Sequence, residues 1–257
     1  MIVTTTRKKA DALAEKARLW STELTSRFIV RNDASVQDLI NAYGEDVLVV
    51  GKARETLYPK EGTEPFFYHP NSAMFRVKQF RKTGYDPLVE TAELMEGMTF
   101  LDCTLGLASD SLVAQIAVGQ SGLVTGVEAN QMLAYMVRSG LQSWQEGSTE
   151  MLAAMRKINV VHKHHSSYLA ALPNKSYDVV YFDPMFEQHL SDSTGIRGLK
   201  QFACHDDLEE DVLSHAIRVA KKRVVLKDHY QSARFQRFGF SVIRRQHSAF
   251  HYAYIQI

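Results

Sequence analysis

The sequence predicts an α/β fold: a mainly parallel sheet that ends in an antiparallel C-terminal hairpin, preceded by a small N-terminal α/β domain. Three observations predict it. From about residue 98, short apolar strands alternate with helical segments, and such strands form parallel sheets that helices cover on both faces. Residues 240–257 alternate between apolar and polar side chains, which indicates a hairpin. Residues 1–50 carry a shorter alternation of strands and helices.

The small domain is expected over residues 1–68. Apolar residues recur at helical spacing over roughly 8–25, so a helix is expected there. A second helix begins after Ser35, a favourable N-cap residue, and stops at Gly44. Short β-branched or apolar runs predict three strands, at 2–6, 28–30 and 47–50.

The segment from Pro65 to Tyr85 has four basic residues, no acidic residue and several aromatic ones. One interpretation is a linker helix whose basic face is solvated while the aromatic rings pack inward. The other is a surface for nucleic acid, because Lys and Arg neutralise phosphates and aromatic rings stack on bases. The basic residues that the second interpretation predicts to bind RNA are Arg76, Lys78, Arg81 and Lys82.

The larger domain is expected over residues 69–257. Ligands of parallel sheets bind at the carboxyl ends of the strands, so the residues that follow each strand are the candidates for a site. Helices are expected after Ser109, from Asn130, over 150–157 and over about 206–220. The expected strands are 99–101, 123–127, 159–161, 178–182 and 223–226, followed by the hairpin.

Composition excludes several classes of protein. A chain of 257 residues has room for one large domain and a small partner. Thirty basic residues against 29 acidic ones argue against a wholly electrostatic nucleic-acid binder. Two distant cysteines, Cys103 and Cys204, exclude a disulfide scaffold and a cysteine zinc finger. The N-terminus has no apolar signal-peptide core, and residues 111–127 are too interrupted to span a membrane, so a cytoplasmic protein without a membrane partner is expected.

Acidic residues end the first two strands of the larger domain. Asp102 precedes a turn with a single glycine, Gly106, so the dinucleotide pattern G-x-G-x-x-G is absent. A carboxylate there would repel a pyrophosphate but suits a ligand with ammonium and sulfonium charges, such as S-adenosylmethionine. Glu128 follows at nearly the interval at which an acidic residue holds ribose hydroxyls. The alternatives are a turn cap for Asp102 and a solvated or helix-capping Glu128.

The third strand leads into His162, His164 and His165, followed by Ser166 and Ser167. The histidines lack the spacing of a known metal site, and alternate strand residues point to opposite faces, so no metal is expected. The two serines lie where this loop would meet the edge of an adenine, and small hydroxyls suit that contact.

The fourth strand ends in Asp183-Pro184-Met185-Phe186. Asp183 and the carbonyl of Pro184 can accept hydrogen bonds from an exocyclic amino group, and Phe186 can stack on its base. These three residues are therefore the candidate catalytic residues. The alternative is an ordinary strand end with a turn proline.

With these residues, the sequence resembles the class I S-adenosylmethionine-dependent methyltransferases, which have a Rossmann-like sheet. Residues 183–186 are similar to their amino-methylating motif D/N-P-P-Y/F, with Met185 in place of the second proline. Together with residues 102–110, 165–167 and 222–227, they resemble the bacterial small-subunit ribosomal RNA guanine-N2 methyltransferases of the J type and their Gram-positive relatives. The resemblance covers about residues 69–230.

The resemblance implies cofactor contacts at Ser109, Asp110, Glu128, Ala129, Ser166, Ser167 and Asp183, beside Asp102 and Gly106. The chain departs from the family's frequent G-x-G-R-D, because Ala108 and Ser109 replace the second glycine and the arginine.

The expected function is methyl transfer from S-adenosylmethionine to an exocyclic amine of RNA. The resemblance implies guanine N2 of ribosomal RNA, free or in the small subunit. Three alternatives stay open: a methyltransferase of a small-molecule or protein amine, a non-catalytic RNA-binding protein, and, least favoured, a nicotinamide dehydrogenase.

Overall fold

A computed structural model describes residues 1–61, 64–184, 207–246 and 248–257. The described residues divide into two compact units, one within residues 1–69 and a larger one within residues 70–184 and 207–257. That each unit is an independently folding domain stays a prediction. Within the described ranges, none of the helices combines the length and the apolar character that spanning a bilayer requires.

The N-terminal unit is a four-stranded sheet with a helix after each of its first two strands. β1 (Ile2–Thr5) pairs in parallel with β2 (Arg27–Phe28) and β3 (Val47–Val50), and β3 pairs antiparallel with β4 (Glu55–Tyr58). The helices are α1 (Ala10–Glu23) and α2 (Val36–Tyr43).

The sequence signals at the ends of α2 are confirmed. Ser35 accepts a hydrogen bond from the backbone of Asp38, and Asp38 accepts one from the backbone of Ser35, so the two residues form a capping box. Gly44 ends the helix with φ +64°, a left-handed conformation that glycine adopts without strain. β4 was not predicted from the sequence.

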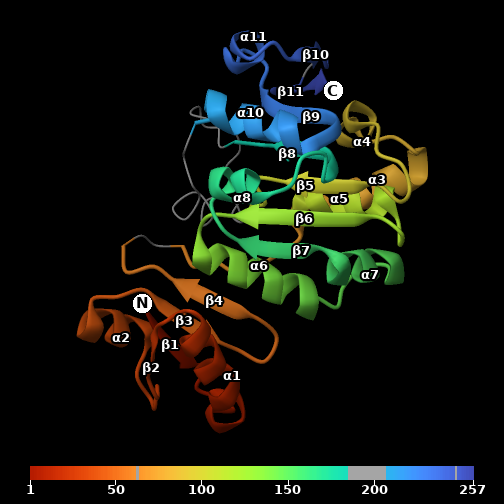
Figure 1. The fold of residues 1–257 in the computed structure, drawn as a ribbon. Coiled ribbons are helices and arrows are strands. Elements are labelled where there is room, and N and C mark those ends of the chain that lie inside the picture. The colour runs from red at the N-terminus through yellow and green to blue at the C-terminus, as the bar shows by residue number, and fades with distance from the viewer. Residues whose placement is uncertain (62–63, 185–206, 247) are drawn as a thin grey trace. The chain divides into compact units, whose positions relative to one another are not determined.

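The larger unit contains a seven-stranded sheet in the order β10-β11-β9-β8-β5-β6-β7 (Figure 1). Strands β7, β6, β5, β8 and β9 pair in parallel, whereas β11 pairs antiparallel with β9 and β10. The mainly parallel sheet with an antiparallel C-terminal hairpin is therefore confirmed. The strands are β5 (Thr99–Asp102), β6 (Leu123–Glu128), β7 (Asn159–His162), β8 (Tyr177–Phe182), β9 (Ala220–His229), β10 (Ser241–Ile243) and β11 (Phe250–Gln256).

Helices cover both faces of this sheet. On one face, residues of α8 and α10 pack with β8 and β9 around Val180, Val224 and Leu226, which are fully buried. α5 lies on the other face, where its Asp110 approaches side chains of β8 and β9. The helices that the structure describes in this unit are α3 (Asn71–Thr83), α4 (Pro87–Ala92), α5 (Ser109–Val118), α6 (Gln131–Ser143), α7 (Thr149–Lys157), α8 (His165–Ala171), α10 (Glu210–Val219) and α11 (Arg234–Arg237).

Candidate active site

The parallel strands bring the predicted acidic residues to one edge of the sheet. Asp102, Glu128 and Asp183 end or follow β5, β6 and β8, which are neighbours in the order β8-β5-β6. The chain runs from β5 to β6 and β7 on one side and returns to β8 and β9 on the other. Such a reversal opens a crevice at the carboxyl ends of the strands, which is where ligands of open α/β sheets bind.

Asp102 holds the loop that follows β5. Its side chain is 1% exposed; Oδ2 accepts a hydrogen bond from Ser111 Oγ at 2.7 Å, and Oδ1 accepts one from the backbone N–H of Thr104 at 3.0 Å. Burial raises the pKa of Asp102 to about 7. The structure thus shows a carboxylate that shapes the loop, and its direct contact with a cofactor stays a prediction.

Glu128 joins the loops that follow β5 and β6. Oε1 accepts a hydrogen bond from the N–H of Asn130 at 2.9 Å, and Oε2 accepts one from the N–H of Gly106 at 3.3 Å. The side chain is 7% exposed, and burial raises its pKa. Gly106 has φ +48°, which glycine adopts freely, so its backbone N–H can face this carboxylate.

Asp183 is tied both to the β5 loop and to β9. Its backbone N–H donates to Thr104 Oγ1 at 2.7 Å, and its Oδ2 accepts a hydrogen bond from Lys227 Nζ at 2.5 Å. Burial raises the pKa of Asp183 to about 6, while the ammonium of Lys227 acts in the opposite direction. The side chain keeps 23% of its surface exposed, so a ligand can reach the carboxylate.

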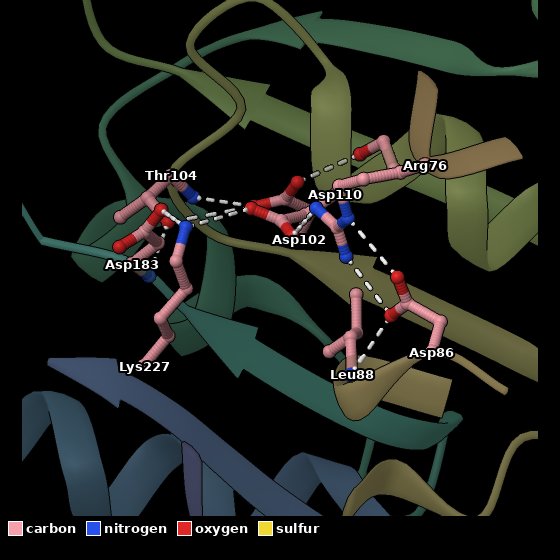
Figure 2. Close-up of polar contacts among 9 residues, drawn as sticks. Arg76, Asp86, Leu88, Asp102, Thr104, Asp110, Asp183 and Lys227 are labelled. Atoms are coloured by element: carbon pink, nitrogen blue, oxygen red, sulfur yellow. Dashed lines mark hydrogen bonds and ion pairs between the residues drawn. The ribbon is translucent and has the colours of Figure 1, made fainter. Parts of the chain in front are cut away.

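A network of buried charges continues from Lys227 to α3 (Figure 2). Lys227 Nζ lies 3.3 Å from Asp110 Oδ2, and Arg76 Nη1 donates to Asp110 Oδ1 at 2.5 Å. Arg76 also binds both oxygens of Asp86, at 2.9 and 3.0 Å. Burial alone would raise the pKa of Asp110, but Lys227 and Arg76 hold it well below its usual range.

The other predicted cofactor residues lie around the same edge. Ser109 and Asp110 form the first turn of α5, and Ala129 directly follows β6. Ser166 and Ser167 lie in the first turn of α8, where the backbone N–H of Ser166 donates to the ring of His164. Pro184 is buried after β8, whereas Phe186 lies outside the described residues, as does Cys204.

The four predicted RNA-binding residues all lie on α3, but their surroundings differ. Arg76 is bound to Asp86 and Asp110, and Arg81 pairs with Glu150. Lys78 and Lys82 are exposed on the same helix. Two aromatic side chains beside them are exposed as well: Phe75 at 77% and Tyr85 at 55%. The interpretation of this segment as a linker helix required its aromatic rings to pack inward, and Phe75 and Tyr85 do not.

Sequence reasoning missed Lys227, Asp86 and Thr104 as parts of the site. Lys227 is a charged residue at the carboxyl end of an apolar strand, which is the signal that identified the acidic residues. Applied to cations as well as anions, that signal would have found it. Asp86 is the N-cap of α4 and has no comparable mark in the sequence.

Comparison with known proteins identifies the family to which the chain belongs. Residues 58–243 match the model of a family described as "Putative SAM-dependent methyltransferase". Over 255 residues, which is 99% of both chains, the sequence is 45% identical to the "Uncharacterized protein YpiP" of Bacillus subtilis.

The chain is also 32% identical over 133 residues to the ribosomal RNA small subunit methyltransferase J of Coxiella burnetii, and this match spans about half of each chain. A crystal structure of a SAM-dependent methyltransferase from Neisseria gonorrhoeae has the same fold, with a TM-score of 0.61 at 15% identity over 100% of this chain and 96% of that one. The family model covers well over half of the chain, and the resemblance seen in the sequence is confirmed. The chain belongs to this family of SAM-dependent methyltransferases, and its cofactor is S-adenosylmethionine.

Proposed function

We propose that the protein methylates an exocyclic amine of RNA in the cytoplasm, at guanine N2 of small-subunit ribosomal RNA. The observation that carries this proposal is Asp183: a partly exposed carboxylate, fixed by Thr104 and Lys227 and followed by a buried Pro184. Its support is the similarity to proteins named ribosomal RNA small subunit methyltransferase J.

The residues around the strand ends fit the cofactor. Its ribose hydroxyls and its ammonium group are hydrogen-bond donors, and the strand ends offer acceptors, led by the carboxylate of Glu128. We assign Glu128 to the ribose, with contacts from Gly106, Ser109, Asp110 and Ala129. Ser166 and Ser167 are assigned to the adenine. S-adenosylmethionine supplies a methyl group on a sulfonium that is already an activated donor.

Asp183 orients the target amine. Lys227 is bonded to Oδ2, and no donor is bonded to Oδ1 within the part of the chain that the structure describes, so Oδ1 is available to accept an N–H of the amine. The carboxylate also stabilises the positive charge that develops on the amine nitrogen as the methyl group arrives. The carbonyl of Pro184 is the second acceptor, and Phe186 the stacking partner, as expected from the sequence. Catalysis then comes mainly from orientation.

Cys103, the cysteine that the structure describes, does not fit the role of a nucleophile. Cys103 is 3% exposed, and burial raises the pKa of its thiol well above the usual value. A buried, protonated thiol cannot attack a base, whereas a reactive cysteine is partly exposed and has a lowered pKa.

We place the RNA on the exposed basic side of α3. Lys78 and Lys82 can neutralise phosphates, and Phe75 and Tyr85 offer exposed rings. Arg76 contributes by holding α3 through Asp86 and Asp110. Replacing Lys78 and Lys82 by Gln should reduce the slope of RNA affinity against salt by about 2. Lys175→Gln, an exposed residue before the start of β8, is the matched control.

The decisive experiment measures transfer of a labelled methyl group to unmodified small-subunit RNA, to small subunits, and to small amines. We expect incorporation into RNA, at guanine N2 after nuclease digestion. Asp183→Asn should lower the rate by about 100-fold while S-adenosylhomocysteine still binds. Incorporation only into small amines, or only into protein, would replace the RNA proposal. Binding of RNA without transfer would identify a non-catalytic RNA-binding protein.

A further inference from the structure

The C-terminal hairpin brings aromatic and cationic side chains to the side of Asp183. Tyr252 pairs with Lys227 across β11 and β9, so the two side chains lie on the same face of the sheet. Phe250, two residues earlier on β11, lies on that face too. Residues of the last strand pair are therefore neighbours of the catalytic carboxylate, although they are far from it in sequence.

Two cations lie close to the ring of Phe250. Lys227 Nζ is 5.0 Å from the centre of its ring, and the guanidinium carbon of Arg245 is 5.3 Å from it. Tyr252 supports the ring edge-on, with centres 6.0 Å apart and planes at 81°. The ammonium that binds Asp183 therefore also contacts Phe250, so the ring and the carboxylate border the same space.

The two cations, Lys227 and Arg245, differ in their ionic partners. Lys227 is bound to Asp183 and Asp110. Arg245 donates to Ser248 Oγ at 3.3 Å, and no carboxylate lies within ion-pair distance of it among the residues that the structure describes. Arg245 and Phe250 are both partly exposed. A partly exposed guanidinium with no carboxylate partner among the described residues, next to a partly exposed ring, suits a ligand that combines a flat aromatic base with a phosphate.

We propose that Phe250 and Arg245 bind the target nucleotide, the ring packing on its base and the guanidinium pairing with a neighbouring phosphate. This inference rests on the proposed action on RNA, and it adds residues of the C-terminal hairpin to the site. The hairpin then determines which nucleotide reaches Asp183, because the base must fit against Phe250 to present its amine.

The test uses the full-length protein with unmodified small-subunit RNA. Phe250→Leu keeps the apolar volume but removes the ring, whereas Phe250→Tyr keeps the ring. We expect Phe250→Leu to raise KM for RNA by about 10-fold to 100-fold, and Phe250→Tyr to stay within about 3-fold of the wild type. Arg245→Gln should reduce the salt slope of RNA binding by about 1, and Lys175→Gln should not change it.

The outcomes separate this inference from the proposed function. Wild-type activity on RNA together with an unchanged KM in Phe250→Leu overturns the inference and leaves the function intact. If Phe250→Leu loses S-adenosylhomocysteine affinity and thermal stability while Phe250→Tyr keeps both, the ring is structural, and the inference is wrong. A wild-type protein that methylates no RNA overturns both.

Discussion

The ammonium of Lys227 lies 2.5 Å from Oδ2 of Asp183, although 44 positions separate the two residues in sequence. It also lies 3.3 Å from Asp110, so one cation serves two carboxylates at the carboxyl end of the sheet. Burial raises the pKa of Asp183 to about 6, and Lys227 limits that rise. We infer that Lys227 keeps Asp183 ionised near neutral pH.

Replacing Lys227 by Met should move the acidic limb of the pH–rate profile to higher pH. In the wild type, activity should fall as the pH is lowered through about 6, because Asp183 then takes up a proton and the proposed mechanism needs its carboxylate form. Without the nearby cation, the pKa of Asp183 should rise by about 1 unit or more, so the limb should move with it. The rate of single-turnover methyl transfer to RNA is measured between about pH 5 and about pH 9, where RNA is not hydrolysed during the assay, and its pH dependence gives the position of the acidic limb.

Two further variants make this prediction specific. Lys227→Arg keeps the positive charge, so its acidic limb should stay near that of the wild type. Asp183→Asn cannot titrate, so its residual rate should show no limb near pH 6. An acidic limb that stays in place in Lys227→Met would show that another group controls the rate.

Arg76→Gln should destabilise the fold, because it leaves the buried Asp86 without a cation and leaves Asp110 with Lys227 alone. Asp86 and Asp110 keep only 5% and 10% of their side-chain surfaces exposed. Removing one partner of a buried ion pair costs about 3–5 kcal/mol, and we expect about 3 kcal/mol because Arg76 is 24% exposed. Urea unfolding monitored by circular dichroism measures the change in the free energy of unfolding.

Lys78→Gln is the matched control, since this residue lies two positions along the same helix and is exposed. Its effect on the free energy of unfolding should stay within about 0.5 kcal/mol. Equal effects of the two variants would mean that the Arg76 network contributes nothing beyond an ordinary surface charge.

Asp102→Asn should change how stability depends on pH. The pKa of Asp102 is raised from 3.8 to about 7 in the fold, so the native state binds its proton more tightly than the unfolded chain does. The stability that this group contributes therefore falls as pH rises from about 4 to about 7. A shift of that size corresponds to roughly 4 kcal/mol, and Asn carries no such penalty.

The measurement is the difference in the free energy of unfolding between Asp102→Asn and the wild type at several pH values. Asn retains the geometry, because its oxygen can accept from the N–H of Thr104 and its amide can donate to Ser111 Oγ. The free energy of unfolding of the variant should increase relative to that of the wild type as the pH rises from about 4 to about 8, a range that includes the unfolded-state and folded-state pKa values of Asp102. A difference that does not vary with pH would mean that Asp102 titrates normally in the fold.

Much of the fold could be predicted from the sequence because its strands are apolar runs that end in polar residues. Four of the described elements were not predicted: β4, α4, α11, and α8, whose first turn holds Ser166 and Ser167 where a loop was expected. β4 consists of Glu-Thr-Leu-Tyr, and its buried Glu55 pairs with Lys16, so a charged residue concealed the strand. α4 has only six residues, and its start at Asp86-Pro87 is also typical of a turn.

The candidate site was predictable to the extent that its residues follow strands. Asp102, Glu128 and Asp183 were found in this way, because the carboxyl ends of parallel strands share one edge of the sheet, however the helices pack. The pairing of Arg76 with Asp110 depends on how α3 packs against α5. From the sequence, a basic residue in a basic segment is expected to be solvated. No residue pattern near Arg76 indicates that it pairs with two buried carboxylates.

The close packing of Gly126 against Leu105 leads to a further prediction. A Cβ on Gly126 would lie 2.2 Å from Leu105 Cδ1, so a side chain in the middle of β6 would push the loop that follows β5. Gly126→Ala should cost about 1–3 kcal/mol through overpacking. Because this loop holds Gly106 against Glu128, S-adenosylhomocysteine should also bind more weakly.

Shortening Leu105 should relieve the clash that Gly126→Ala creates. Leu105→Ala alone should lower the free energy of unfolding by about 2–5 kcal/mol, since the residue is 3% exposed and its removal leaves a cavity. In the double variant the new methyl group partly fills that cavity, so the combined loss should be smaller than the two single losses added together, by about 1 kcal/mol or more. Urea unfolding and calorimetric titration with S-adenosylhomocysteine give both quantities for the three variants. Additive losses of stability and affinity would mean that the loop does not depend on the glycine, and that Glu128 keeps its place without the close contact.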